Sequence, residues 1–465
     1  MRKTRRETDS MGRIEVPRDA LYGAQTARAA ENFPISGWRM PREFIAAIGL
    51  IKRAAAEVNR RAGRLASRQA GAIIRAAQEV IDGDLDKHFV VDVFQTGSGT
   101  STNMNANEVI ANRANQLLGR RLGGKGSVHP NDHVNMAQSS NDVIPTAMHV
   151  SVAVAIRRRL MPALRDLREA LAVKARQFDR IVKIGRTHLM DAVPIRLGQE
   201  FCGYAAQVQG TLRMLDQALG FLYELPIGGT AVGTGLNAPK GFGRNVRKRL
   251  SQVTGLPFGG SCNHFAAQGA KDAAVFISGA MKTTAIAMGK IASDIRLMGS
   301  GPRCGLGELL LPAVQPGSSI MPGKVNPVIC ESVIQVACQV VGFDAAVTLG
   351  ATGGVGSILE LNVAMPLIAV NLLEAAGLLT NAARVFGDKC IRGLRADKER
   401  CRELIEQSLA MVTALAPKVG YDAAAEIAKE AHATGKTIRQ VCMDKKLLPE
   451  RELNALLDPR KQTGT

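Results

Sequence analysis

Apolar residues recur every three or four positions along three long stretches of this 465-residue chain. This spacing matches one face of an α-helix, so each stretch predicts a long helix that packs at a shallow angle against its neighbours. The sequence is also typical of helices through 145–178 and 365–388. The three apolar series are Phe201, Ala205, Val208, Leu212, Leu215, Leu219 and Leu222; Met281, Ala285, Met288, Ala292 and Ile295; and Ile329, Val333, Val336, Val340, Phe343 and Val347. The pattern predicts an all-α protein built on a long helical bundle.

These helices are expected to be apolar on more than one side. The stretch 199–225 carries Tyr204, Met214 and Phe221 outside its apolar series. A helix of ~25 residues is ~40 Å long, and one packed only within its own chain would show a clear polar face. The pattern therefore favours a bundle that continues across copies of the chain. A monomeric bundle with thick internal packing is the alternative.

Changes in the character of the sequence predict three domains. Residues 1–140 mix short helices with polar, glycine-rich loops, and residues 141–393 hold the long helices. Residues 394–465 form a small module of short helices, in which Asp397 is the expected N-cap ahead of KERCRELIEQ. A chain of this length is ample for two or three domains.

The net charge of +19 raises the possibility of nucleic-acid binding. The basic residues are dispersed, however, and their largest clusters, Arg157 to Arg159 and Lys445 with Lys446, are short. Aromatic residues make up only 4% of the chain, which leaves few platforms for base stacking. We interpret the charge as a solvated surface that attracts small anions and expect no nucleic-acid partner.

The sequence gives no sign of a membrane segment or a secretory leader. No run approaches the ~20 uninterrupted apolar residues that a spanning helix needs. The start, MRKTRRETDSMGR, has basic residues but no apolar stretch behind them. We therefore expect a cytoplasmic protein with no membrane partner.

The eight cysteines show no metal-binding arrangement. They lie at 202, 262, 304, 330, 338, 390, 401 and 442, without a C-x-x-C pair or a His/Cys cluster at zinc spacing. Most, such as Cys338, fall in apolar segments that are predicted to be helical, and we interpret them as reduced core residues. We expect no metal, no cofactor and no disulfide.

The segment 317–327, GSSIMPGKVNP, is the most informative candidate for chemistry. Gly317 and Gly323 permit unusual backbone angles, and the prolines at 316, 322 and 327 oppose regular pairing, so it is predicted to be a loop. Pro327 suits the first position of the helix that follows, and Asn326 the N-cap before it. The loop carries Ser318, Ser319 and Lys324 onto a helix start, where anions are favoured. An ordinary surface loop with a good cap is the alternative.

Three further segments are rich in hydrogen-bond donors. Each one alone could be a simple helix cap, but together with Lys324 they suggest a polar cavity for a dicarboxylate. We expect Ser139, Ser140 and Asn141 to precede a helix that starts near Pro145, and Thr187 and His188 to precede a turn at Pro194. The candidate residues of the three segments are Ser98, Thr100 and Asn103; Ser139, Ser140 and Asn141; and Thr187 and His188.

The same segments resemble, in order, the signature blocks of the class II fumarase/aspartase superfamily. Besides GSSIMPGKVNP, the blocks are QTGSGTSTNMNANEV (95–109), HPNDHVNMAQSSND (129–142), GRTHLMDAVP (185–194) and GGTAVGTGLN (228–237). The resemblance runs nearly end to end. It implies a three-domain, fumarase/aspartase-like fold, and a homotetramer whose central helices merge into one bundle with active sites shared between copies.

The resemblance also implies roles for particular residues. Ser318 would act as the general base beside a substrate carboxylate and leave a carbanion stabilised as an aci-carboxylate. Glu331, one turn into the helix after Pro327, would pair with His188, which exchanges a proton with water. The implied substrate-binding residues are Ser98, Thr100, Asn103, Ser139, Ser140, Asn141, Thr187, Ser319, Lys324 and Asn326.

A second anion site is also implied, at His129, Asn131 and Asp132. A capped turn at Pro130 explains the same residues at least as well. Most fumarases that resemble this chain have an acidic residue where it has His133, which puts the details of this second site in doubt.

Within the superfamily, the residues of the signature segments favour fumarate hydratase, which interconverts fumarate and L-malate. The segment from Thr96 to Thr100 and the Ser139-Ser140-Asn141 triplet resemble the fumarase pattern. The segment ILELNVAMP (358–366) leans instead toward aspartate ammonia-lyase, which is the alternative. A non-catalytic scaffold should have gaps among the catalytic residues, and none is visible here.

Overall fold

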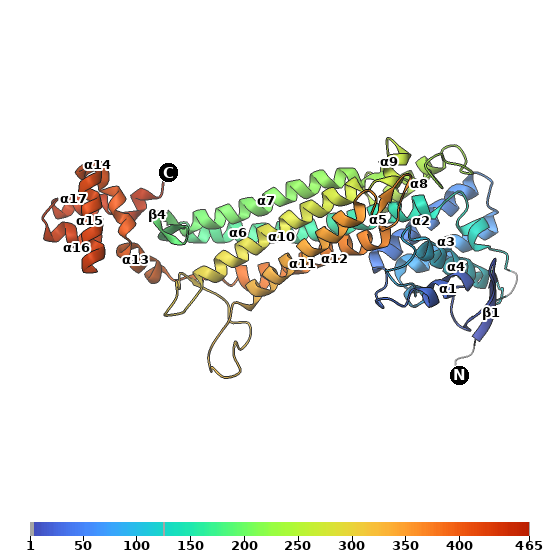
Figure 1. Ribbon diagram of the computed structural model, residues 1–465, viewed down its shortest axis with the longest axis horizontal. Coiled ribbons are helices and arrows are strands. Elements are labelled where there is room, and N and C mark those ends of the chain that lie inside the picture. The colour runs from blue at the N-terminus through green and yellow to red at the C-terminus, as the bar shows by residue number, and fades with distance from the viewer. Residues whose placement is uncertain (1–3, 124–125, 465) are drawn as a thin grey trace. The chain divides into compact units, whose positions relative to one another are not determined.

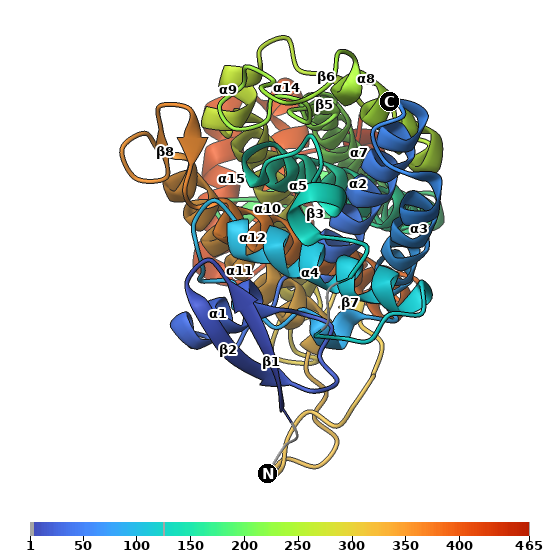
Figure 2. The ribbon, with the colours of Figure 1, turned by 90° about the vertical axis from the view of Figure 1, so that its right-hand side faces the viewer.

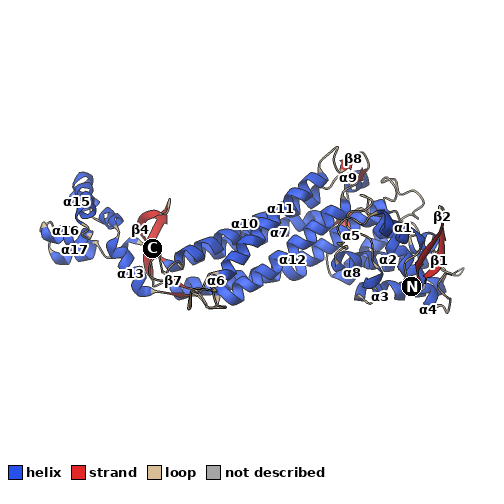
Figure 3. Cartoon of the chain, turned by 60° about the horizontal axis from the view of Figure 1, so that its bottom comes forward, coloured by secondary structure: helices blue, strands red, loops and turns tan. Residues whose placement is uncertain are grey.

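The computed structural model describes residues 4–123 and 126–464, so the first three residues of the basic N-terminal segment lie outside it. Helices dominate the described chain, and its strands form short two-stranded sheets (Figure 3). The prediction of an all-α protein is confirmed. The structure groups the chain into two compact units, one from 1–162, 213–283 and 338–380 and the other from 163–212, 284–337 and 381–465. The three-domain division at 140 and 393 stays a prediction.

The first compact unit contains the N-terminal hairpin and a group of packed helices. The hairpin pairs β1 with β2 in antiparallel register from Thr4↔Pro17 to Asp9↔Gly12, and it lies beside α1 (Figure 2). Helices α2 and α3 pack together, and α2 also contacts α5 and α8. The bounds are β1 Thr4–Asp9, β2 Gly12–Pro17, α1 Ala24–Asn32, α2 Arg42–Arg61, α3 Ser67–Asp82, η1 Asp86–His88, α4 Thr100–Leu117, η2 Pro130–Val134, α5 Ser140–Ala155, η3 Ile156–Leu160, β5 Glu224–Leu225, α8 Phe242–Thr254, β6 Gly259–Gly260, α9 His264–Gly269, β8 Ser357–Ile358 and β9 Leu361–Asn362.

Five helices contribute residues to both units, and they include the three predicted from the apolar series (Figure 1). Their bounds are α6 Met161–Phe178, α7 Leu197–Leu222, α10 Asp272–Met298, α11 Val328–Ala351 and α12 Met365–Phe386, the last followed by η4 Gly387–Ile391. The series of α10 is fully buried from Met281 to Ile295, and that of α7 is buried except for Ala205. Apolar burial along these series stabilises the bundle, at roughly 1.5–3 kcal/mol per fully buried large side chain.

The second compact unit contains the remaining strands and the C-terminal helices. Asp397 caps α13 as predicted, because its carboxylate accepts the N–H of Arg400 at 2.9 Å. The C-terminal helices share a core that includes Leu415, Val441 and Leu453. The bounds are β3 Val182–Thr187, β4 Met190–Arg196, β7 Leu309–Leu310, β10 Arg395–Ala396, α13 Lys398–Gln407, η5 Leu409–Ala414, α14 Ala416–Val419, α15 Tyr421–Thr434, α16 Ile438–Asp444, α17 Glu450–Leu456 and η6 Pro459–Gln462.

Several large apolar side chains on the long helices are exposed in the single chain. On α7, Met214 and Phe221 are exposed, as expected for residues outside the apolar series, whereas Tyr204 is buried and donates its hydroxyl hydrogen to Asp294 at 3.0 Å. On α11, Leu349 is 62% exposed. By length and composition alone, α11 and the segment Met365–Ile391 could each cross a membrane, although core helices of soluble proteins pass the same test. Only 28% of the apolar window in α11 is buried, so this helix leaves much apolar surface uncovered.

Candidate functional site

In the first compact unit, the start of α4 meets the start of α5. The Thr100 hydroxyl lies 2.9 Å from that of Ser98 and 2.7 Å from that of Ser140, so three hydroxyls form a continuous chain. Just before this chain, Gly97 lets the backbone of Val363 pack closely, because a Cβ at Gly97 would lie 1.7 Å from the carbonyl oxygen of Val363. Two of the predicted polar segments are thus in direct contact.

Helix α5 starts earlier than predicted. Ser139 is its N-cap and forms a capping box with Asp142, so Ser140 and Asn141 lie in the first turn and Pro145 lies inside the helix. The capping box pairs the N–H groups of Ser139 and Asn141, and this decides the helix start in place of the proline. Ser140 and Asn141 therefore stand on a helix N-terminus, where anions are favoured.

A third block of the sequence, 228–237, is held against α5 by hydrogen bonds to Asn141 and Asp142. The Asp142 carboxylate accepts the N–H groups of Gly228 at 2.9 Å and Thr230 at 3.0 Å, and Asn141 donates to the carbonyl oxygen of Ala231 at 2.8 Å. Burial raises the pKa of Asp142, although its backbone hydrogen bonds oppose the shift. Three of the quoted blocks therefore converge in this unit.

In the second compact unit, Thr187 and His188 lie at the tip of the β3–β4 hairpin. The expected turn at Pro194 is wrong, because Pro194 pairs with Ile184 inside the hairpin. The turn is formed by His188 and Leu189, with φ of 57° and 61°. A two-residue hairpin turn needs positive φ at both central positions to match the strand twist. Such angles cost residues other than glycine about 1–2 kcal/mol each, so this exposed tip is strained.

A buried group of charges supports the base of this hairpin. Arg186 donates from Nη1 to both carboxylate oxygens of Glu308, at 2.9 and 3.0 Å, and the ammonium of Lys183 lies 3.4 Å from the same carboxylate and 3.3 Å from that of Glu200. Glu308 is completely buried, and burial raises the pKa of Glu200. Removing one partner would leave a buried charge uncompensated, which is strongly destabilising. The network therefore fixes the strand that leads to Thr187 and His188.

The segment 317–327 forms a loop that closes on itself. The N–H of Gly317 donates to the carbonyl oxygen of Lys324 at 2.8 Å, and the Ser318 hydroxyl accepts the N–H groups of Ile320 and Met321 at 3.2 and 3.0 Å. Lys324 is exposed. The loop thus carries a hydroxyl and an ammonium on a self-supporting turn.

The cap of the helix that follows this loop differs from the prediction. Helix α11 begins at Val328, and the carbonyl oxygen of Pro327 accepts the first helical hydrogen bond, from the N–H of Glu331 at 3.1 Å. Asn326 instead donates to the carbonyl oxygen of Gly317 at 2.6 Å and closes the loop. Its side chain is drawn back by this bond and so does not cap the helix. Glu331, partly buried, and Ser319, exposed, lie on either side of this junction.

The residues of the implied second anion site form a capped turn in the first compact unit. His129 precedes the π-helical turn η2, and its ring accepts the N–H of Asp132 at 3.2 Å. Its own N–H donates to the ring of His133 at 2.8 Å. Burial lowers the pKa of His133, which favours this acceptor role. Asn131 and Asp132 are exposed.

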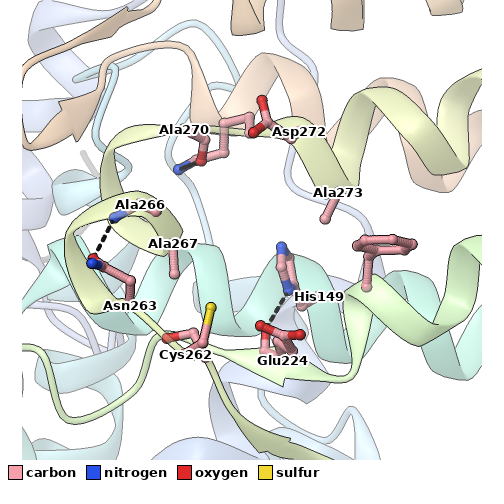
Figure 4. A pocket seen from close by; sticks show the side chains of 12 residues that line it. His149, Glu224, Cys262, Asn263, Ala266, Ala267, Ala270, Asp272 and Ala273 are labelled. Atoms are coloured by element: carbon pink, nitrogen blue, oxygen red, sulfur yellow. Dashed lines mark hydrogen bonds between the residues drawn. The ribbon is translucent and has the colours of Figure 1, made fainter.

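A separate cavity of about 140 Å³ lies elsewhere in the first compact unit and contains none of the predicted site residues. His149 projects from α5 into it, and one ring nitrogen contacts the carbonyl oxygen of Glu224 at 2.9 Å (Figure 4). The lining is mostly small side chains from the α9–α10 region. The lining residues are His149, Phe221, Glu224, Ser261, Cys262, Asn263, Ala266, Ala267, Ala270, Lys271, Asp272 and Ala273.

His149 makes the stability of the fold depend on pH. Burial lowers its pKa from about 6.5 to about 4. The unfolded chain takes up the proton below about pH 6.5 while the folded chain does not, so stability is lost as the pH falls from about 6.5 toward 4, by up to about 3 kcal/mol. We expect His149→Gln to flatten this dependence in thermal unfolding at several pH values, and the exposed His432→Gln to leave it unchanged. Equal slopes for the two variants would contradict the assignment.

The cysteines are less buried than predicted. All eight are free, but Cys202, Cys262, Cys304 and Cys338 are exposed. Cys338 lies on the uncovered side of α11. The apolar sequence around it did not distinguish this exposed position from a core position. Among residues 4–123 and 126–464, no group of three or more His, Cys, Asp or Glu side chains could hold a metal ion.

The structure thus brings some predicted site residues together and leaves others apart. Ser98, Thr100 and Ser140 are in contact, with Asn103, Ser139 and Asn141 on the same two helix starts. The hairpin tip and the 317–327 loop share no hydrogen bond with each other within the described part of the second unit.

Sequence reasoning missed the polar residues that support the first group, of which Lys52 is buried and Asn135 and Gln138 are partly buried. Lys52, Asn135 and Gln138 form hydrogen bonds beside Asn103. A usable signal was present, because Lys52 interrupts the apolar face of α2 between Ile48 and Ala55. A lysine at such a position must be buried or must break the pattern.

Comparison with known proteins fits this arrangement. A family model described as Lyase matches residues 12–342, and one described as Fumarase C C-terminus matches residues 411–464. Class II fumarate hydratase 2 of Bradyrhizobium diazoefficiens is 54% identical over 99% of this chain and 97% of its own length. The class II fumarate hydratase of Rhizobium meliloti is 51% identical over the whole of both chains.

A solved structure extends the likeness to the fold. The crystal structure of recombinant class II fumarase from Schistosoma mansoni has a TM-score of 0.96 and 41% identity, and 99% of each chain is covered. The predicted fumarase/aspartase fold is confirmed by this match. With half of all positions identical to curated relatives end to end, this chain belongs to the class II fumarate hydratases of the lyase family.

Proposed function

We propose that this protein catalyses the reversible, stereospecific hydration of fumarate to L-malate. The observation that carries the proposal is the cluster of Ser98, Thr100, Ser140 and Asn141 on two helix starts, in a chain whose relatives are named fumarate hydratases. Neutral donors at helix N-termini can hold carboxylates without burying many fixed charges. Ser139 and Asn103 would complete the substrate-binding set on these helices.

The remaining substrate contacts would come from Thr187, Ser319, Lys324 and Asn326. The exposed Lys324 would supply the cation for a substrate carboxylate, and Asn326 would hold the loop in register. Preorganised donors and a cation at the developing negative charge are the largest expected contribution to such catalysis.

In the proposed reaction, Ser318 removes a proton from the carbon beside a carboxylate of L-malate. The electron pair moves onto that carboxylate as an aci-form, and the hydroxyl on the neighbouring carbon leaves as water. His188, oriented by Glu331, donates the proton to the leaving hydroxyl, and hydration runs in reverse. Serine is a weak base at its free pKa, so the loop must close over the substrate and exclude water. The strained backbone at His188 supports a functional role for this turn.

We further propose a homotetramer in which several copies of the chain complete each active site. The exposed apolar residues of α7, α10 and α11, among them Phe221, Ile286 and Leu349, support coverage of these helices by other copies. The hairpin tip, where Leu189 and Met190 are 74% and 70% exposed, is a second uncovered apolar surface. Sedimentation analysis in detergent-free buffer should give four times the chain mass; a monomer there would contradict the proposal.

The test of function is an ultraviolet absorbance assay with three substrates in turn. Absorbance of fumarate should appear with L-malate and disappear when fumarate is hydrated, with no metal or cofactor added. Fumarate formed from L-aspartate alone would instead identify an aspartate ammonia-lyase. No change with any of the three substrates would support a non-catalytic scaffold.

At the proposed second anion site, we expect substitution of His129, Asn131 or Asp132 to leave turnover intact.

A further inference from the structure

Lys52 is a fully buried lysine on the apolar face of α2. Its exposed fraction is 0%, and its helical neighbours Ile48, Ile51 and Ala55 are equally buried. A buried ammonium costs free energy unless its three hydrogens find acceptors. Burial also lowers the pKa of Lys52, to about 7. An apolar residue would fill this position without the free-energy cost of burying an ammonium, so a role for the charge itself is expected.

The hydrogen bonds of Lys52 lead to the residues of the proposed substrate pocket. Its ammonium donates to Asn135 Oδ1 at 2.8 Å and to Gln138 Oε1 at 3.0 Å. Asn103 donates from Nδ2 to the same Asn135 oxygen at 3.2 Å. Gln138 directly precedes Ser139, the N-cap of α5. One ammonium therefore holds the segment that leads into α5, and through Asn135 it is linked to Asn103 of α4.

This geometry sets the direction of each hydrogen bond. A lysine can only donate, so Asn135 and Gln138 must present their oxygens to it. Because Asn135 Oδ1 is turned toward Lys52, Asn103 can approach it only with its NH₂ group. The oxygen of Asn103 is left buried, without a partner among the described residues. It remains available as an acceptor for an O–H donor.

The charge of Lys52 is not neutralised by a contacting carboxylate. None of the ion pairs among the described residues includes it, and Asp142 of α5 is the charged group that interacts with it at longer range. The carboxylate of Asp142 is itself engaged by backbone N–H groups. The other charged groups near α2 are paired or exposed. Glu57 pairs with Arg53 and with Arg249 of α8, and Glu79 of α3 pairs with Arg113 of α4. In η2, Asp132 is exposed and the ring of His133 accepts the N–H of His129.

We propose that Lys52 is a positioning residue of the substrate pocket, which fixes the amides of Asn135, Gln138 and Asn103 and adds a buried positive charge that favours a dianion. This inference rests on the proposed function. It assigns Asn103 a different role from the other donors, since its free oxygen suits the hydroxyl of malate or the reacting water and not a carboxylate.

The test compares Lys52→Met, which keeps the length of the side chain without its charge, with the wild type. We expect KM for fumarate to rise roughly tenfold or more, because a charge near the pocket is lost, while kcat changes much less. In the wild type, KM should also rise as the pH increases from about 6 to about 8, because Lys52 loses its proton in that window. In Lys52→Met, that step should be absent.

Lys174→Met is the matched control, because Lys174 is also buried but donates to the carbonyl oxygen of Leu394. Its KM and pH dependence should match the wild type. A KM for Lys52→Met equal to that of this control, in an active wild-type background, would overturn the inference and leave the proposed function standing. An inactive wild type would instead overturn the proposed function.

A second variant keeps the inference testable if Lys52→Met fails to fold. Asn135→Asp preserves the oxygen that accepts from Lys52 and from Asn103, but neutralises the ammonium with a contacting carboxylate. We expect the same rise in KM and the same loss of its pH step. An unchanged KM in a folded Asn135→Asp protein would refute the role of the charge.

Discussion

Ser318→Ala is expected to lower kcat for malate dehydration and fumarate hydration by roughly 10²–10⁴-fold, the usual contribution of a general base. The assembly should stay intact, because Ser318 lies in a loop on the surface of the single chain and, among the described residues, its hydroxyl bonds only within that loop. Steady-state absorbance kinetics together with sedimentation analysis would measure both quantities. Turnover close to that of the wild type would refute the assignment of the base.

The loop geometry requires a control for this substitution. The Ser318 hydroxyl accepts the N–H groups of Ile320 and Met321, so alanine removes a turn-forming acceptor as well as the proposed base. Ser318→Asn keeps an acceptor for the same turn, since asparagine forms equivalent turns with its own backbone, but it has no hydroxyl. It should be as inactive as Ser318→Ala. Recovery of activity in Ser318→Asn would mean that the hydroxyl only shapes the loop.

Glu331→Gln is expected to lower kcat and to change the pH profile of kcat. In the proposed mechanism the carboxylate orients the imidazole of His188 for proton exchange, and a neutral amide would withdraw that support. Substrate affinity should change less, because neither side chain is assigned to a substrate carboxylate. The measurement is kcat across the pH range, with KM determined at each point.

A helix start gives Glu331 a second possible role, and the control separates the two. Acidic residues in a first turn commonly complement the helix dipole. Glu399 occupies the first turn of α13 in the same way, so Glu399→Gln removes an equivalent dipole contact. It should leave the pH profile of kcat unchanged. If Glu331→Gln behaves like Glu399→Gln, Glu331 is a structural residue and His188 must be oriented by another group.

The long helices were predictable because their signal is local and repeated. Each apolar series keeps a period of 3.6 residues over about four turns or more, and a packed bundle requires that period. The cap at Asp397 was predictable for the same reason, since the carboxylate and the N–H of Arg400 are three residues apart. Such features need no knowledge of distant parts of the chain.

The errors arose where a distant partner decided the local structure. Pro194 looked like a turn, but its pairing with Ile184 placed it in a strand and moved the turn to His188. Asn326 looked like a helix cap, but the carbonyl oxygen of Gly317 took its side chain. Strand pairing in the first case and a side-chain hydrogen bond in the second outweighed a local preference of about 1 kcal/mol.

By itself, the sequence determined the helical architecture, the polar segments and the superfamily, because each is written in short-range patterns of residue type. Only the tertiary structure decided that Ser98, Thr100 and Ser140 touch, that His188 occupies a strained turn above a buried ion network, and that Lys52 is buried beside Asn103. These facts depend on which distant groups share a low-dielectric interior. There an unpaired polar atom is costly, so the whole fold selects the partner of each one.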